Sequence, residues 1–397
     1  VLEVTEACNF RCKYCIYNED YEGNRDFGTA KMSQEIAQKA IDYLAEHSSS
    51  HFAVTFYGGE PLANFPLVRW ATEYTLEHYK DKHPTFNLTT NLTLVTDEIA
   101  DFLARTPGFS VVVSLDGPEE VQNAARVYSA NKPTFADAMR GLNTLSKAFI
   151  KHGKSLTINS VLIPPYTYEK LERINSFFES LDFLPPLTQC MITYPSPGTF
   201  PVENAVELMS GNPTYEFGAA LNPLLKWQFE KAKQNGLSWE HTQNIYFNTM
   251  LKMMETIDGR MVTDAPDDLY HCNGCCVPGS RKLYVKANGD LLICERIGSS
   301  PIIGNIFTGI DKTLLSEKYD TEYVARSLPA CKNCWAVNLC PICYANCYTE
   351  DGIDPAEKAS NCNGVRSQLE RCFSMFYELL EENPSALDAL KETTRSS

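Results

Sequence analysis

Hydrophobic and polar positions in the first half of the chain form short apolar runs separated by longer amphipathic stretches. The apolar runs predict six strands, at residues 2–5, 52–57, 86–89, 110–115, 155–163 and 187–194. The stretches between them repeat apolar residues every three to four positions and predict helices at 33–47, 64–82, 96–105, 134–152 and 167–181. Strands that alternate with helices in this way predict an α/β fold with a parallel sheet and right-handed crossovers.

Polar or glycine-rich positions directly follow four of the predicted strands. They are Cys8, Gly58, Asn91 and Asp116. In parallel α/β folds, ligands bind at the carboxyl ends of the strands. We therefore expect these four positions to converge on one binding site.

The pattern changes in the second half of the chain. Proline and glycine punctuate 195–213, and helical periodicity returns at 215–234 and 244–257. From 271 the chain is rich in cysteine, and two alternating runs flank Asn288-Gly289, a favoured hairpin turn. An amphipathic tail helix follows from Gly364. The pattern therefore predicts three parts: a core at 1–212, a helical connecting region at 213–270, and a cysteine-rich domain with a hairpin and a C-terminal helix at 271–397.

Charge and hydropathy narrow the range of partners. The formal net charge is −15 and the pI is about 5.0, which argues against binding to a phosphate backbone. No apolar run reaches the roughly 18 residues of a membrane span, and the first residues do not form a signal peptide. We expect neither a nucleic acid nor a membrane as a partner.

The chain has 15 cysteines, and they are clustered. Three lie at 8–15, eleven lie at 272–372, and Cys190 stands between the groups. An odd number of clustered thiols without a secretion signal favours metal or cluster ligation over disulfides.

The first cluster is the C-x3-C-x2-C loop formed by Cys8, Cys12 and Cys15. Three thiolates can hold three irons of a [4Fe–4S] cluster and leave the fourth iron open, as catalytic zinc sites leave one position open. A zinc site with a distant fourth ligand and simple packing of three cysteines are the alternatives.

This loop resembles that of the radical S-adenosylmethionine (SAM) enzymes. The resemblance implies that Cys8, Cys12 and Cys15 bind a cluster whose open iron is chelated by the amino and carboxylate groups of SAM. One electron from the cluster would cleave SAM to methionine and a 5′-deoxyadenosyl radical, which abstracts a hydrogen atom.

Three further stretches resemble motifs of the same family: "YGGEP" at 57–61, "TTNLTL" at 89–94, and "VSLDGP" at 113–118 with an arginine eight residues later. The implied SAM-binding residues are Tyr14, Gly58, Gly59, Glu60, Pro61, Asn91, Ser114, Asp116, Arg126 and Leu162. The chain departs from the family at Leu92, where a glycine is usual, and at Gln122-Asn123, where His-Asp is frequent. The backbone conformation at Leu92 and a role of Gln122 and Asn123 toward the substrate therefore stay open.

The C-terminal cysteines resemble the SPASM extension of radical SAM enzymes, which carries two auxiliary [4Fe–4S] clusters. The implied ligands of the first cluster are Cys272, Cys276, Cys294 and Cys347. Those of the second are Cys331, Cys334, Cys340 and Cys362. Cys275 and Cys343 compete for places at the first site. A zinc ribbon is the alternative to two auxiliary clusters. Cys190 and Cys372 are expected to be structural.

The resemblance implies three [4Fe–4S] clusters, SAM, and an electron donor such as flavodoxin or ferredoxin. SPASM enzymes mostly modify peptides. The sequence around the cysteine loop looks most like that of maturases of cysteine-rich peptides. We therefore expect a cytoplasmic peptide maturase that forms a Cys thioether in a ribosomally made precursor. Many such maturases carry a peptide-recognition domain ahead of the core, which would precede Val1.

Other functions stay open. One is an enzyme that matures anaerobic sulfatases by forming formylglycine, in which Glu295 would replace the usual Asp base after the post-hairpin cysteine. Another is a maturase that forms a C–C cross-link. A protein that binds metal or senses redox state without catalysis is the alternative from a different class.

Overall fold

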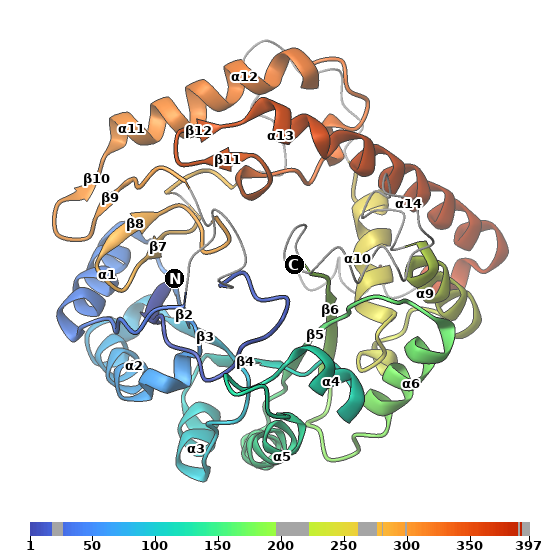
Figure 1. Cartoon of the computed structure of the whole chain (residues 1–397), viewed down its shortest axis with the longest axis horizontal. Coiled ribbons are helices and arrows are strands. Elements are labelled where there is room, and N and C mark those ends of the chain that lie inside the picture. Colours follow the sequence, from blue (N-terminus) through green and yellow to red (C-terminus); the bar gives the residue numbers. More distant parts are fainter. Residues whose placement is uncertain are drawn as a thin grey trace.

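The computed structural model describes residues 1–17, 27–195, 222–260, 276–279, 281–297, 300–387 and 390. Six strands form its central sheet, and they pair side by side in sequence order with every neighbouring pair parallel. They are β1 (Leu2–Thr5), β2 (Ala53–Gly58), β3 (Thr85–Thr90), β4 (Phe109–Ser114), β5 (Thr157–Val161) and β6 (Gln189–Thr193). Figure 1 shows the strands curving around the inside of the molecule with the helices outside. The predicted α/β fold with a parallel sheet is confirmed.

Helices connect successive strands on the outer face. They are α1 (Gln34–His47), α2 (Phe65–Tyr79), α3 (Asp97–Arg105), α5 (Phe135–Lys151) and α6 (Tyr168–Glu179). Ser33, Thr96 and Thr167 cap α1, α3 and α6 by accepting a backbone N–H from the first turn. The stretch predicted as one helix at 64–82 forms α2, which is flanked by 3₁₀ turns at Pro61–Asn64 and Lys80–Lys82. A short helix, α4 (Glu119–Ala125), was not predicted, because seven residues give too few turns for a clear period.

The predicted hairpin is confirmed, and it joins the main sheet. Strands β7 (Tyr284–Val285) and β8 (Asp290–Leu292) pair antiparallel, and β7 lies parallel to β1 with Leu2 opposite Val285. The buried Glu3 carboxylate accepts the Tyr284 hydroxyl at 2.5 Å and the Ala287 N–H at 3.1 Å. Two short strands, β9 (Gly304–Asn305) and β10 (Gly309–Ile310), extend the sheet to ten strands. The cysteine-rich part is therefore hydrogen-bonded to the first strand of the core.

The other elements complete the ring seen in Figure 1. They are α9 (Asn222–Asn235), α10 (Phe247–Asp258), α11 (Lys312–Ser316), α12 (Glu322–Cys331), β11 (Tyr348–Thr349), β12 (Gly352–Ile353), α13 (Pro355–Ser360) and α14 (Cys362–Glu382). The helix at 244–257 is confirmed as α10, whereas 215–221 lie outside the described residues. The amphipathic tail helix is confirmed as α14, which buries Leu369, Phe376 and Leu379 and leaves Leu380 43% exposed.

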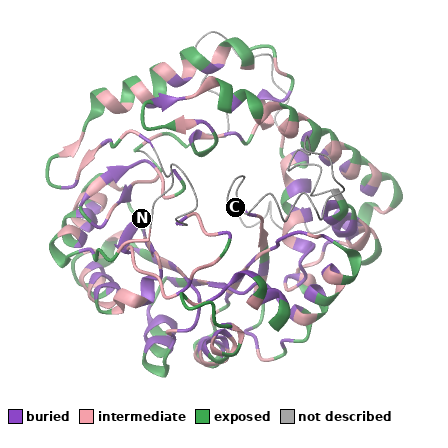
Figure 2. Cartoon of the chain, in the orientation of Figure 1, coloured by how far each residue is buried: buried purple, intermediate pink, exposed green. Residues whose placement is uncertain are grey.

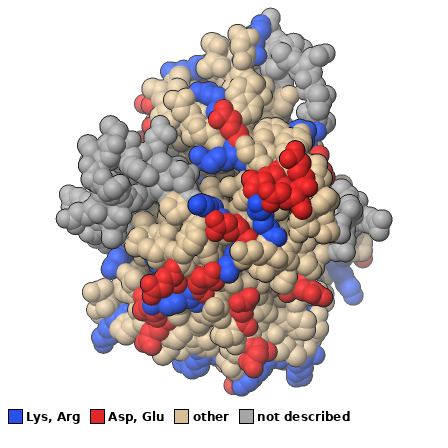
Figure 3. All heavy atoms as spheres, turned by 90° about the vertical axis from the view of Figure 1, so that its right-hand side faces the viewer, with Lys and Arg blue, Asp and Glu red and all other residues tan. Residues whose placement is uncertain are grey.

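Burial follows the sheet. Figure 2 shows buried residues concentrated on the strands and on the inward sides of the helices. Figure 3 shows acidic and basic side chains interspersed on the face that it presents, although the whole chain carries a net charge of −15. In the described part of the chain, no helix combines the length and apolar character needed to cross a bilayer.

Leu92 keeps a backbone shape that usually requires glycine. Its φ is +73°, its side chain is fully buried, and its carbonyl oxygen lies 2.1 Å from where a Cβ on Gly141 would stand. Helix α5 can therefore approach this loop only because residue 141 has no side chain. The sequence alone did not decide the backbone conformation at Leu92. In the structure this conformation is left-handed, and α5 packs against it.

We expect Gly141→Ala to destabilise the fold, because the new methyl group must displace the Leu92 carbonyl. Overpacking of this kind costs about 1–3 kcal/mol of unfolding free energy. Gly364→Ala is the matched control, because a Cβ there meets open space and alanine favours a helix. Urea midpoints measure both variants; equal midpoints would contradict the close approach.

Candidate functional site

The N-terminal cysteine loop follows β1 and brings three thiols under each other's electrostatic influence. The Phe10 N–H donates to the Cys8 Sγ and the Tyr17 N–H donates to the Cys15 Sγ, each at 3.4 Å. Burial, with a smaller contribution from the charge of Cys15, raises the pKa of Cys8 to about 11 and that of Cys12 to about 12. Backbone N–H donors to sulfur favour the thiolate, the form that binds metals. The loop thus fits a thiolate-bound cluster.

The two glycines of "YGGEP" let the end of β2 lie against this loop. The Gly59 N–H donates to the Thr5 carbonyl and the Glu60 N–H donates to the Ala7 carbonyl, both at 2.9 Å. A Cβ on Gly59 would lie 2.3 Å from the Ala7 oxygen, and Gly58 has a φ of +138°. The glycines therefore position the cysteine loop by direct backbone contact.

The Glu60 carboxylate is buried and is engaged by the protein itself. Its Oε1 accepts the Thr90 hydroxyl at 2.8 Å and the Leu62 N–H at 3.1 Å, and its Oε2 accepts the Asn91 N–H at 2.7 Å. Burial raises the pKa of Glu60, while these three donors lower it. The side chain joins the ends of β2 and β3, and Pro61 begins the 3₁₀ turn after it.

Asn91 links the end of β3 to the cysteine loop. Its Nδ2 donates to the Asn9 Oδ1 at 2.8 Å, while the Asn9 Nδ2 donates to the Thr93 hydroxyl at 2.9 Å. Asn91 is 5% exposed. The residue predicted to bind SAM therefore also fixes the loop between Cys8 and Cys12.

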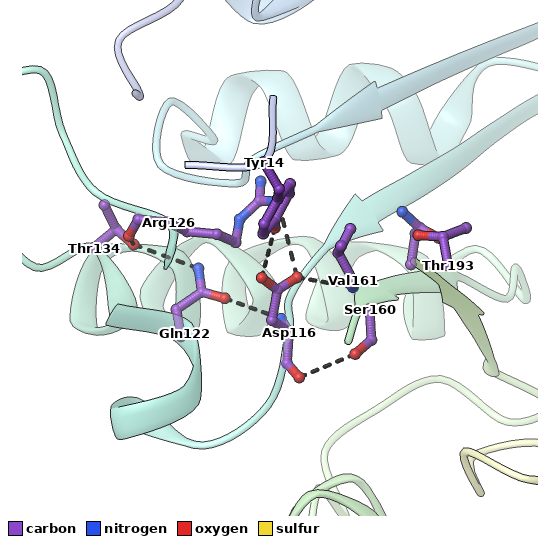
Figure 4. A network of polar contacts seen from close by, with 9 residues as sticks. Tyr14, Asp116, Gln122, Arg126, Thr134, Ser160, Val161 and Thr193 are labelled. Atoms are coloured by element: carbon purple, nitrogen blue, oxygen red, sulfur yellow. Dashed lines mark hydrogen bonds and ion pairs between the residues drawn. The ribbon is translucent and has the colours of Figure 1, made fainter. Parts of the chain in front are cut away.

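A buried group of three polar side chains lies beside the cysteine loop (Figure 4). The Tyr14 hydroxyl donates to the Asp116 Oδ2 at 2.5 Å, and the Arg126 Nη1 donates to the Tyr14 oxygen at 2.8 Å. Arg126 also forms an ion pair with the Asp116 Oδ1 at 3.9 Å, and the Val161 N–H donates to that oxygen at 3.0 Å. The group joins the loop, the end of β4, the end of α4 and the end of β5.

Arg126 supplies a buried positive charge next to the thiols. Burial raises the pKa of Cys12, and the Arg126 charge acts in the opposite direction. Among the described residues, the Arg126 Nε is buried without a hydrogen-bond partner. A buried donor of this kind fits an anionic ligand, such as the carboxylate of SAM.

Gln122 and Asn123 support the protein backbone. The Gln122 Oε1 accepts the Asp116 N–H at 2.9 Å. The Asn123 Oδ1 accepts the N–H groups of Thr134 and Phe135 at 2.9 and 3.1 Å, at the start of α5. Sequence reasoning missed these structural roles, because the accepting side chain and its donors lie on different elements.

Ser114 and Leu162 lie at the same edge of the sheet. Ser114 is the last residue of β4 and is 8% exposed. Leu162 was predicted inside the fifth strand but follows its end; its N–H donates to the Thr193 carbonyl at 2.9 Å, and its side chain is 1% exposed in the core. Both residues are close to the predicted edge, and their contact with SAM stays a prediction.

Four C-terminal cysteines line one small cavity, as the proposed second auxiliary site requires: Cys331, Cys334, Cys340 and Cys362. Burial raises the pKa of Cys340 and of Cys362, and the field of Cys331 raises both further. This set of thiols suits a four-cysteine cluster.

The residues assigned to the first auxiliary cluster are described only in part. Cys294 follows β8, receives the Arg296 N–H at 3.4 Å, and has its pKa raised by burial to about 11. Cys347 is buried and Cys276 is exposed, whereas Cys272 and Cys275 lie outside the described residues. Cys343 begins the turn that ends at Cys347. The ligand set stays a prediction.

Glu295 is paired with a lysine. Lys282 donates to its Oε1 at 2.9 Å, and the Cys294 thiol donates to its Oε2 at 3.4 Å. Burial acts to raise the pKa of Glu295, but the hydrogen bond and charge of Lys282, together with hydrogen bonds from the backbone and from Cys294, outweigh burial and hold the pKa below its usual value. As long as this pair is intact, Glu295 is a weak base.

Two cysteines are buried away from these groups. Cys190 lies on β6 and Cys372 on α14, and both belong to the hydrophobic core. Across the ranges that the structure describes, no three His, Cys, Asp or Glu side chains lie close enough together to hold a single metal ion. Ligation of clusters by particular thiols therefore stays a proposal.

The family of the chain is shown by comparison with known sequences. The sequence model of the Radical SAM superfamily matches residues 2–178. An uncharacterized protein of Methanocaldococcus jannaschii is 31% identical over 309 residues, which cover 77% of this chain and 87% of the relative. The chain belongs to the radical SAM superfamily. As a radical SAM enzyme, it uses SAM and a [4Fe–4S] cluster.

Other relatives extend the comparison. A serine-type anaerobic sulfatase-maturating enzyme of Bacteroides thetaiotaomicron is 32% identical over 162 residues, covering 40% of this chain and 39% of the relative. The structure of anSMEcpe with bound AdoMet and the Kp18Cys peptide has a TM-score of 0.63 at 20% identity and covers 99% of both chains. Streptococcus suis SuiB bound to the precursor peptide SuiA has a TM-score of 0.52 at 17% identity, covering 87% of this chain and 71% of SuiB. The fold of these two solved structures thus extends over the C-terminal part of the chain as well.

Proposed function

We propose that this chain is a peptide maturase that uses a 5′-deoxyadenosyl radical to install a cross-link, a Cys thioether, in a ribosomally synthesised precursor peptide. The observation that carries the proposal is a three-thiol loop and a separate four-thiol cavity on one fold. That fold is shared, over most of the chain, with structures solved with bound peptides.

The proposed cluster ligands at the first site are Cys8, Cys12 and Cys15. When bound there, the cluster and SAM would supply the radical that abstracts hydrogen. The chain's own residues hold this site: Gly59 fixes the loop, and Arg126 presents the buried Nε donor toward an anionic group. Tyr14 and Asp116 hold Arg126 in place.

The proposed auxiliary clusters use the two C-terminal sets of cysteines. A first auxiliary site at Cys294 would bind the substrate thiolate or accept the electron that remains after bond formation. A flavodoxin or ferredoxin would supply electrons, and the oxygen sensitivity of reduced clusters favours a cytoplasmic location.

The second candidate is maturation of an anaerobic sulfatase by formylglycine formation. The partial match to the sulfatase-maturating relative favours it, as does a carboxylate at Glu295 directly after Cys294. The hydrogen bond from Lys282 argues against it, because a carboxylate with a lowered pKa takes up a proton poorly.

The test is incubation of reconstituted enzyme, SAM and reductant with the neighbouring cysteine-rich precursor peptide. We expect each thioether to lower the peptide mass by two hydrogens. One hydrogen atom goes to the deoxyadenosyl radical, and the thiol loses a proton while one electron passes to an auxiliary cluster.

A peptide with serine in place of the reacting cysteine is the control, and it should keep its mass. A sulfatase peptide that loses mass while the precursor does not would favour the second candidate. Deoxyadenosine formed without any change in the precursor would contradict peptide cross-linking.

A further inference from the structure

Lys358 is a buried lysine that connects two helices next to the four-thiol cavity. It lies on α13 and is 5% exposed. Its Nζ donates to the Tyr323 hydroxyl at 2.8 Å and to the Ser327 hydroxyl at 2.7 Å, both on α12. The ammonium also lies 4.1 Å from the centre of the Tyr323 ring.

The partners of this ammonium are neutral. Among the residues that the structure describes, no carboxylate lies within ion-pair distance of Lys358, whereas Lys318 in the same region pairs with Glu322 at 3.1 Å. A buried charge without an opposite charge is strongly unfavourable, since neutral hydroxyls replace only part of its hydration. The position therefore calls for an anionic group nearby.

The thiols that line the cavity can supply that anionic group as thiolates. Lys358 lines it together with Cys331, Cys334, Cys340 and Cys362. The two hydroxyl partners lie on the helix that ends at Cys331, and Lys358 lies four residues before Cys362.

Lys358 differs from the other basic residue at the cavity. Arg366 is half-exposed and donates to the Asn363 side chain. Solvent screens the Arg366 charge, whereas the Lys358 charge acts through protein of low polarity. Both cations line the cavity, and Lys358 is the one that is shielded from solvent.

We propose that Lys358 is the fixed counter-charge of the four-thiol site and raises the reduction potential of the cluster held there. The proposal rests on the cluster ligation put forward above. Reduction adds one negative charge to a four-thiolate cluster, and a buried cation stabilises the reduced form more than the oxidised form. Lys358 would thereby make this site a better electron acceptor.

The test is a redox titration of the full chain, followed by EPR and absorbance. The parent carries Cys8→Ala, Cys12→Ala and Cys15→Ala, so that the N-terminal loop contributes no cluster signal. Lys358→Met removes the charge at similar length, Lys358→Arg keeps it, and Lys312→Met removes an exposed lysine as the matched control. Iron per chain is measured for every protein.

We expect Lys358→Met to lower the ratio of reduced to oxidised cluster about tenfold at a fixed potential. This corresponds to a midpoint about 59 mV more negative for a one-electron couple. One component of the titration should move, while Lys358→Arg and Lys312→Met should leave both components in place. Loss of this iron in Lys358→Met but not in Lys358→Arg would also support the need for a positive charge.

Two other outcomes would overturn the inference. One is an unchanged midpoint in Lys358→Met with its iron retained. The other is loss of iron in both Lys358 variants, which would assign the residue to packing alone. A parent whose iron content is unaffected by Cys340→Ala would instead overturn the proposed ligation.

Discussion

Replacing Cys12 with alanine is expected to abolish reductive cleavage of SAM while iron stays bound at the C-terminal cysteines. The middle thiol of the loop is partly buried near Arg126, Cys8 and Cys15, and its removal leaves two thiolates for a cluster that needs three. The auxiliary cysteines lie on other elements and lose no ligand. Deoxyadenosine formation, measured by chromatography, should fall at least about 10³-fold, as expected when a group essential to the chemistry is lost.

Cys190→Ala provides the matched control. Cys190 is buried in the core on β6, where its N–H donates to the Thr242 carbonyl. This variant should lose some stability and keep SAM cleavage. Cleavage retained by Cys12→Ala, or abolished equally by Cys190→Ala, would contradict the assignment of the loop.

Replacing Arg126 with methionine is expected to lower the free energy of unfolding by about 3–5 kcal/mol, because it leaves the Asp116 carboxylate buried without its cation. Asp116 and Arg126 are 1% and 6% exposed, so solvent cannot replace the lost charge. SAM affinity should fall as well, since the buried Nε donor is lost. Urea unfolding and calorimetric titration with SAM measure the two effects separately.

Two further variants make this prediction specific. Arg140→Met removes an ion pair with Asp137 at 3.1 Å whose side chains are 59% and 47% exposed, and it should cost at most about 1 kcal/mol. Adding Asp116→Asn to Arg126→Met should restore part of the stability, because the unpaired charge is then gone. Equal losses in Arg126→Met and Arg140→Met would show that the buried pair is not needed.

Much of the fold was predictable because its signals are local. The alternation of apolar runs and helical periods placed all six parallel strands within a few residues of their observed ends. The hairpin turn at Asn288-Gly289 was predicted for the same reason. Short α4 and the two-residue strands β9 and β10 lie below the length at which periodicity is visible.

The site was predictable to a lesser degree. The spacing of Cys8, Cys12 and Cys15 selects a three-thiol loop, because these residues are neighbours in the chain. The hydrogen-bond partners of each polar residue could not be predicted from spacing in the chain. The sequence did not show that Glu60 accepts three donors from the protein, or that Asn123 caps a helix that begins twelve residues later.

The sequence by itself determined the α/β class of this protein, its membership in the radical SAM superfamily, and the places where thiols gather along the chain. Only the tertiary structure decided which groups pair inside it. Tyr14 meets Asp116 and Arg126 across more than 100 residues, Lys358 meets Tyr323 and Ser327 on another helix, and β7 pairs with β1. Periodicity and spacing report contacts between chain neighbours, whereas buried charges and hydrogen bonds depend on which distant segments folding brings together.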